Sequence, residues 1–206
     1  MKVTLIGDSL RQQYGPKVAE ILKDEFEVWQ PAENCRFAKY TLRGLFDWRN
    51  DMAGSDIVHW NNGHWDLCNL FGDGPFSTEE EYIENMLRIL DILQTRHKVI
   101  IFATTSPVLK DGFNTNAAVE RYNEIIVPLL QERGVIINDL HTLIKSDLQR
   151  YMSTDTIHLS EEGIKVCAAQ VAECIREAAK KVNEINVATT NTEEIEKSGA
   201  PVLLEN

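Results

Sequence analysis

The sequence contains no run of apolar residues long enough to cross a membrane, since a spanning helix needs about 20 of them. Basic residues are also scarce: 21 Lys and Arg stand against 32 Asp and Glu, which gives a net charge of −11. This surplus of negative charge argues against binding to nucleic acid or to an anionic membrane surface. We therefore expect a substrate that is neutral or weakly charged.

Motifs for metal or nucleotide chemistry are missing as well. The four cysteines lack the paired spacing of a zinc site, and Cys167 and Cys174 are too far apart along a predicted helix to form a disulfide. There is no His-Glu-x-x-His motif and no glycine-rich phosphate loop, so we expect neither metal nor cofactor. Free thiols, and a start without a basic segment leading into a long apolar region, predict a cytoplasmic protein without a signal peptide.

The residues that are present predict a single α/β domain. At 206 residues the chain is long enough to bury one sizeable core. Short β-type runs occur at about 3–6, 26–29, 56–61, 98–103 and 135–138. Helical patterns occur at about 13–24, 42–48, 78–96, 117–133 and 160–183. This alternation predicts a three-layer α/β/α sandwich with a five-stranded parallel sheet. We expect the domain to span 1–183 and a polar, mobile tail to follow over 184–206.

Two short motifs stand next to predicted elements. Gly7-Asp8-Ser9-Leu10 directly follows the first strand, and Asp155-Thr156-Ile157-His158 precedes the last helix. A serine nucleophile needs a base, and the base needs an acid that fixes its tautomer. Taken alone, Asp155 and His158 could be a turn acid and a histidine near a helix cap. Together with Ser9 they predict nucleophilic acyl transfer.

The two motifs resemble the first and last blocks of the SGNH, or GDSL, hydrolase superfamily, and the resemblance covers about residues 1–182. It implies the flavodoxin-like fold of that family. It also implies that Ser9 is the nucleophile, His158 the general base and Asp155 the orienting acid. By the same resemblance, the backbone N–H of Ser9 donates to the oxyanion.

The third block departs from the family pattern. In Gly63-His64-Trp65-Asp66, Trp65 stands where the family carries its oxyanion asparagine. The preceding residues, from Asn61 to Trp65, are similar to the Asn-Thr-Gly-His-Trp run of the PC-esterase branch, which includes plant polysaccharide O-acetyltransferases. We therefore expect Asn61 to supply the amide donor, with Asn62 as second choice. Both residues could instead only shape the turn before Gly63.

The second block of the family contributes a glycine N–H, but Gly44, the nearest glycine downstream, lies within a helical pattern. We expect a backbone donor in the loop 34–38, or the Arg36 side chain, to replace it. An arginine also follows Gly-Asp-Ser in the PC-esterase branch, as Arg11 does here. The residues that we expect to bind substrate are Asp8, Arg11, His64 and Trp65.

These observations favour a serine esterase that acts on small O-acyl esters of carbohydrates, chiefly acetyl esters, with a small molecule or an oligosaccharide as substrate. One alternative is transfer of the acyl group to a sugar hydroxyl, which shares every step up to the acyl-enzyme. A lysophospholipase or a thioesterase is another alternative. A non-enzymatic alternative is a glycan-binding protein whose catalytic site has been disabled by the change at Trp65.

Overall fold

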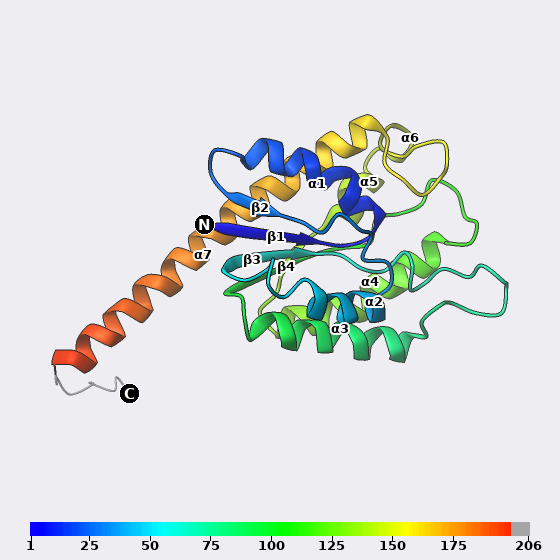
Figure 1. Cartoon of the computed structure of the whole chain (residues 1–206). Coiled ribbons are helices and arrows are strands. Elements are labelled where there is room, and N and C mark those ends of the chain that lie inside the picture. Colours follow the sequence, from blue (N-terminus) through cyan, green and yellow to red (C-terminus); the bar gives the residue numbers. More distant parts are fainter. Residues whose placement is uncertain (199–206) are drawn as a thin grey trace.

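The computed structural model describes residues 1–198. Figure 1 shows an α/β body from which the last helix projects. The strands are β1 (Lys2–Ile6), β2 (Glu27–Trp29), β3 (Ser55–Trp60), β4 (Val99–Ala103) and β5 (Ile136–Asn138). The helices are α1 (Ser9–Leu22), α2 (Ala38–Asp47), α3 (Glu79–Gln94), α4 (Asn116–Glu132), α5 (Leu140–Lys145), α6 (Leu148–Tyr151) and α7 (Glu161–Ser198). The strands form one parallel sheet in the order β2-β1-β3-β4-β5, which confirms the predicted five-stranded sandwich and is the flavodoxin-like order.

The strands form where apolar side chains can be buried on both faces of the sheet, as parallel sheets require. In β1, Val3 and Leu5 point into a core that α1 and α7 cover, whereas Ile6 belongs to a second core beneath α2, α3 and α4. Every residue of β4 is buried. Figure 1 shows the two helical layers on opposite sides of the sheet. Burying each large apolar side chain contributes about 1.5–3 kcal/mol to folding.

Side-chain caps fix where α1 and α3 begin. α3 starts with a capping box, in which Thr78 and Glu81 each accept a backbone N–H from the other. α1 starts at Ser9 and not near residue 13 as predicted, because Asp8 Oδ1 accepts the Leu10 N–H at 2.9 Å and caps the helix earlier. The nucleophile candidate is therefore the first residue of a helix.

The last helix is longer than predicted. We expected it to end near residue 183, but α7 continues to Ser198, so 184–198 are helical and not an irregular tail. No glycine or proline occurs from residue 164 to residue 198, and such residues are the strongest stop signals. Ile185 and Val187 are exposed on this extension. The rest of the predicted tail, 199–206, lies outside the described residues.

The topology opens a crevice at the carboxyl ends of β1 and β3. The chain leaves β1 toward α1 on one face of the sheet and leaves β3 toward α3 on the other face. Such a divergence is where open α/β sheets bind their ligands. The loops after β1, β2 and β3 meet there, as the bonds Cys35 N to Gly7 O and Asn61 N to Ile6 O show.

Candidate active site

The turn after β1 presents Ser9 at the start of α1. Gly7 is needed in this turn because a Cβ there would lie 1.9 Å from Asn61 Oδ1. The first N–H groups of a helix have no partner within the helix, and the helix dipole favours negative charge at this end. Among the described residues, no acceptor is found for the Ser9 N–H. This turn can therefore offer both a nucleophile and an anion-binding N–H.

The loop 152–160 brings the other two catalytic candidates to Ser9. Ser9 Oγ lies 2.9 Å from His158 Nε2, and His158 Nδ1 lies 2.8 Å from Asp155 Oδ2. Because the carboxylate accepts the proton on Nδ1, Nε2 is left to accept the serine proton. The three residues form one continuous chain, in the order that nucleophilic acyl transfer requires.

The two oxygens of Asp155 have separate tasks. Oδ2 holds the His158 ring, while Oδ1 accepts the N–H groups of Ile157 and His158 and the Ser153 hydroxyl. Partial burial would raise the pKa of Asp155, but these hydrogen bonds outweigh it and hold the pKa well below its ordinary value. The acid therefore stays ionised and keeps the imidazole oriented.

Gln13 ties this loop to the nucleophile's helix. Its side-chain amide accepts the Leu159 N–H at 2.9 Å and donates to the Leu159 carbonyl at 3.5 Å. Leu159 follows His158 directly, and it also pairs with Met152 in an isolated antiparallel bridge. His158 is thus held against α1 although 149 residues separate it from Ser9.

The neighbouring amides of Asn61 and Asn62 are used differently. Asn62 is fully buried, with Oδ1 accepting from Trp60 Nε1 at 2.6 Å and Nδ2 donating to the Arg36 carbonyl at 2.7 Å. Asn61 Oδ1 accepts the Tyr14 hydroxyl at 3.1 Å, but its Nδ2 donates to no group among residues 1–198. Of the two predicted donors, Asn61 is the one whose NH₂ group remains available beside the serine turn.

The loop after β2 does not present its Arg36 N–H to the site, because that group donates to Asn34 Oδ1 at 2.7 Å. Arg36 adopts a positive φ of 53°, a conformation that glycine adopts most readily. Its guanidinium lies over the Tyr40 ring, 4.7 Å from the centroid. Asn34, the first residue of the loop 34–38 from which a backbone donor was predicted, lines the pocket next to Ser9 with its side chain. With Oδ1 occupied, its Nδ2 is the group that can face a ligand.

Asp8 and Arg11 lie beneath the site and not in it. Asp8 is 1% exposed and caps α1. Arg11 is 2% exposed and donates to the carbonyls of Pro31 and Glu33 at 2.9 and 2.6 Å. Neither residue lines the pocket at Ser9. Arg11 thus holds the loop after β2 against the serine turn, where we had expected a substrate contact.

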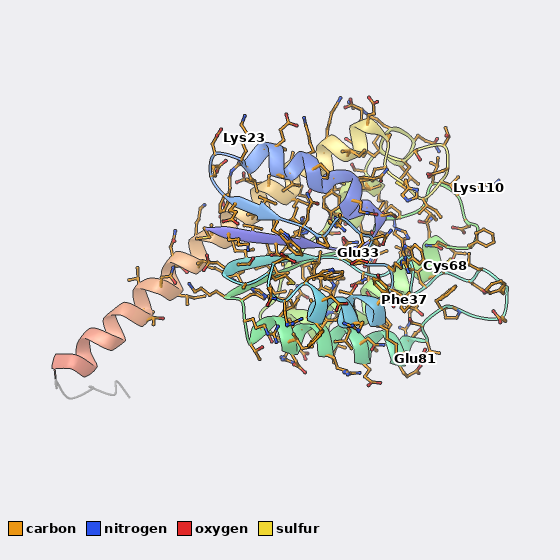
Figure 2. All side chains as sticks on the ribbon, viewed as in Figure 1. Lys23, Glu33, Phe37, Cys68, Glu81 and Lys110 are labelled. Atoms are coloured by element: carbon orange, nitrogen blue, oxygen red, sulfur yellow. The ribbon has the colours of Figure 1, made fainter. Side chains whose placement is uncertain are left out.

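The pocket in front of Ser9 has a volume of about 390 Å³. It is lined by Ser9, Asn34, His64, Trp65, Cys68, Leu70, Phe76, Asn114, Ile157 and His158. Figure 2 shows Cys68 and Phe37 at this end of the molecule, with Lys23 at the other. The predicted substrate residues His64 and Trp65 therefore reach the pocket. Asn114 and Phe76 were not predicted to line the pocket, because they lie in loops far from Ser9 in the sequence and no local pattern marks them.

His64 has no nitrogen free to act as a base. The Asn114 amide donates to Nδ1 at 2.9 Å, so the proton resides on Nε2, which lies 3.2 Å from Ser106 Oγ. Burial lowers the pKa of His64, which keeps the ring neutral. His64 is therefore a fixed part of the pocket wall.

Asp66 joins the loops that surround the pocket. Both of its oxygens accept the Ala38 N–H, at 3.0 and 3.1 Å, and Oδ1 also accepts the Ser77 hydroxyl at 2.9 Å. The carboxyl thereby caps α2, whose own first residues provide no side-chain cap. Burial raises the pKa of Asp66 to about 7, although these hydrogen bonds oppose the shift.

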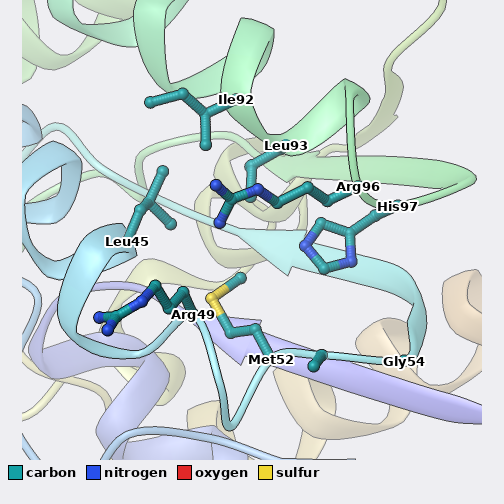
Figure 3. Close-up of a pocket in the computed structure, with 9 residues that line it drawn as sticks. Leu45, Arg49, Met52, Gly54, Ile92, Leu93, Arg96 and His97 are labelled. Atoms are coloured by element: carbon teal, nitrogen blue, oxygen red, sulfur yellow. The ribbon is translucent and has the colours of Figure 1, made fainter.

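A second cavity, of about 430 Å³, lies at the amino ends of β3 and β4. Figure 3 shows Arg96 and Met52 pointing into it, with Leu45 and Ile92 around it. Its lining is apolar and basic and contains no serine, cysteine or carboxylate. This second cavity lies at the opposite end of the sheet from Ser9. The pocket in front of Ser9, at the carboxyl ends of the strands, is therefore the candidate active site.

Known proteins resemble the chain in both sequence and fold. The chain is 31% identical over 176 residues to GDSL esterase/lipase CPRD49 of Arabidopsis thaliana, covering 70% of this chain and 69% of that relative. It is 28% identical over 189 residues to GDSL esterase/lipase WDL1 of Oryza sativa, covering 84% and 71%. No family model matches the chain.

Solved structures show the same fold. The acetyl xylan esterase AlAXEase superposes with a TM-score of 0.73 at 19% identity, covering 85% of this chain and 100% of that chain. The acetylxylan esterase Axe2 of Geobacillus stearothermophilus superposes with a TM-score of 0.69 at 14% identity, covering 84% and 92%. Within residues 1–198, no helix has the length and apolar character of a membrane span.

Proposed function

This chain belongs to the GDSL esterase/lipase family and is an ester hydrolase, and from that premise we propose that it removes small O-acyl groups, chiefly acetyl, from carbohydrates. The observation that carries the proposal is the unbroken chain from Ser9 through His158 to Asp155, opening into a pocket with aromatic walls.

The hydrogen bonds support the following reaction. His158 Nε2 takes the proton of Ser9 Oγ as that oxygen bonds to the ester carbonyl carbon. The resulting oxyanion is stabilised by the Ser9 N–H and by Asn61 Nδ2. His158 then protonates the departing sugar oxygen, which leaves an acyl-enzyme. A water molecule, deprotonated by His158, attacks the acyl carbon and releases the carboxylic acid and free Ser9.

The pocket lining supports an uncharged, hydroxylated ligand. Trp65 and Phe76 offer flat apolar surfaces of the kind that pack against a sugar ring, and Asn34 provides an amide for hydroxyl groups. No acidic, lysine or arginine side chain lines the pocket. Two structures with this fold come from acetyl xylan esterases, which also favours acetylated sugars.

We also propose that the protein works in a reducing compartment such as the cytoplasm. All four cysteines are free thiols. Burial raises the pKa of Cys35 and Cys174 to about 11 each, which keeps these two thiols protonated and unreactive. Such thiols fit a compartment in which disulfides do not persist.

The first test is pre-steady-state hydrolysis of p-nitrophenyl acetate, butyrate and octanoate by wild type and Ser9→Ala. We expect a burst of nitrophenol with wild type that declines as the acyl chain lengthens, and no burst with Ser9→Ala, because the acyl-enzyme needs Oγ. Acetate release from acetylated xylooligosaccharides, measured with and without added acceptor sugar, then checks the substrate class. A preference for octanoate would contradict the carbohydrate proposal, and activity retained by Ser9→Ala would contradict the mechanism.

A further inference from the structure

An asparagine can stabilise an oxyanion with only one end of its amide. The NH₂ group donates to the negative oxygen, whereas the carbonyl end would repel it. The two ends are nearly the same size, so packing alone does not choose between them. A site that uses Asn61 therefore needs a neighbour that recognises its oxygen.

Tyr14 is that neighbour. Its hydroxyl donates to Asn61 Oδ1 at 3.1 Å, and its side chain is 1% exposed. Burial raises the pKa of Tyr14 well above its ordinary value, so the phenol keeps its proton. No other acceptor for this hydroxyl is found among residues 1–198. The bond therefore fixes which end of the amide faces Tyr14.

The position of Tyr14 is rigid relative to the nucleophile. Tyr14 lies on α1, the helix that begins with Ser9. Its ring packs edge-on against His59 of β3, with centroids 6.0 Å apart and planes at 89°. Asn61 is the first residue after β3. One helix and one strand thus fix both the serine and the amide.

The other end of the Asn61 amide is open. Asn61 Nδ2 has no acceptor among the described residues, and it is not one of their enclosed, unpartnered polar atoms. The amide lies against Gly7, two residues before Ser9, where a Cβ would be 1.9 Å from Oδ1. Asn61 lines a small cavity with Tyr14 and Ser106 and not the pocket in front of Ser9, so Nδ2, the end of the amide away from Tyr14, is the group left to donate toward the serine turn.

We propose that Tyr14 is a positioning residue of the oxyanion hole: by holding Asn61 Oδ1, it turns Nδ2 toward the oxygen that becomes negative on acyl transfer. This inference rests on the proposed role of Asn61. It adds to the triad a residue that touches neither substrate nor reacting atoms.

The test is a double-mutant cycle with Tyr14→Phe and Asn61→Ala on p-nitrophenyl acetate. Removing one oxyanion donor costs about 100- to 1,000-fold in kcat, which we expect for Asn61→Ala. For Tyr14→Phe we expect a loss of about tenfold in kcat, the size of one neutral hydrogen bond, with KM within about twofold. In the double variant we expect no loss beyond that of Asn61→Ala, because Tyr14 acts only through Asn61.

Tyr82→Phe is a matched control. Tyr82 is also fully buried, and its hydroxyl donates to the backbone carbonyl of the adjacent Asn62 at 3.0 Å. We expect Tyr82→Phe to lower the thermal unfolding temperature as Tyr14→Phe does, but to leave kcat within about twofold of wild type.

Three outcomes would overturn the inference: wild-type kcat in Tyr14→Phe, multiplicative losses in the double variant, or an equal loss of kcat in Tyr82→Phe. A wild-type kcat in Asn61→Ala would remove both Asn61 and Tyr14 from the oxyanion hole. The proposed function would still stand in that case if the Ser9-dependent burst persists, so the two failures are distinguishable.

Discussion

Two loops at the carboxyl end of the sheet each present a histidine and an aspartate to the same pocket region, and only one pair is built for proton transfer. In the loop 152–160, Asp155 Oδ2 and His158 Nδ1 are 2.8 Å apart. In the loop after β3, no hydrogen bond joins His64 and Asp66 among the contacts of residues 1–198. The same two residue types are therefore bonded to each other in one loop and to separate partners in the other.

Backbone geometry and burial account for the difference. The side chain of Asp155 is 53% exposed, yet backbone N–H groups and Ser153 keep its pKa low. Asp66 is fully buried, and its pKa is raised to about 7. The proposed orienting acid, Asp155, is thus the carboxyl that remains partly hydrated and receives several hydrogen bonds. If the more buried carboxyl were taken as the orienting acid, Asp66 would be chosen in place of Asp155.

The largest expected contrast is between the two histidines. His158→Gln should lower kcat for p-nitrophenyl acetate by about 10⁵- to 10⁶-fold, because the general base is lost. His64→Gln should lower kcat by no more than about tenfold, since glutamine can keep a hydrogen bond to Asn114 or Ser106. Steady-state kinetics with both variants checks this contrast. A loss in His64→Gln comparable to that in His158→Gln would show that the pocket wall takes part in proton transfer.

The two aspartates should differ almost as much. Asp155→Asn should lower kcat about 10⁴-fold, because the imidazole would be held in the wrong tautomer. Asp66→Asn should leave kcat within about threefold of wild type, since the amide oxygen can still accept the Ala38 N–H. The same kinetic assay measures both. Equal losses would contradict the separation of roles that the two loops show.

The pH dependence of the free energy of unfolding tests the raised pKa of Asp66 independently of the kinetics. The folded pKa of about 7 lies above the ordinary value of 3.8, so between these values the folded protein binds more protons than the unfolded chain. The contribution of Asp66 to stability is therefore greatest at low pH and declines as the pH rises toward 7. Urea unfolding at pH 5 and pH 8 should show a larger decline for wild type than for Asp66→Asn. An identical decline in both proteins would place the pKa of Asp66 near its ordinary value.

The smallest expected effect concerns substrate binding by the loop after β3. Trp65 is 39% exposed and lines the pocket. Trp65→Ala should raise KM for acetylated xylooligosaccharides about five- to tenfold, the size of a lost aromatic contact, and leave kcat for p-nitrophenyl acetate within about twofold. Phe46→Ala, which removes an exposed aromatic of α2 outside the pocket, is the control. Equal KM changes in both variants would argue against a sugar contact at Trp65.

The sequence was sufficient to predict the sheet and to select Ser9, Asp155 and His158 as residues that meet, because both predictions depend on local patterns. Runs such as 98–103 identify buried strands without reference to the rest of the chain. Gly-Asp-Ser and Asp-x-x-His each stand at the edge of a predicted element. The early start of α1 could also have been found, since Asp8 is a good helix cap placed just before Ser9.

Other features depend on contacts between distant segments and could not be predicted. Arg11 is turned inward by carbonyls of the loop after β2, some 20 residues away. The choice between Asn61 and Asn62 depends on Tyr14 and Arg36, which belong to other elements. The short helices α5 and α6 were not predicted, because segments of 6 and 4 residues contain too little periodic pattern.

The separation of Ser9 and His158 by 149 residues has a consequence for how activity arises during synthesis. Ser9 is synthesised long before His158, and the two side chains meet only when the loop 152–160 is held by Gln13 and α7 packs on α1. Ester turnover in a translation reaction therefore reports the moment when the whole domain has closed. For the same reason, two fragments divided between β3 and β4 would each lack esterase activity. The activity regained on mixing them would measure their reassembly.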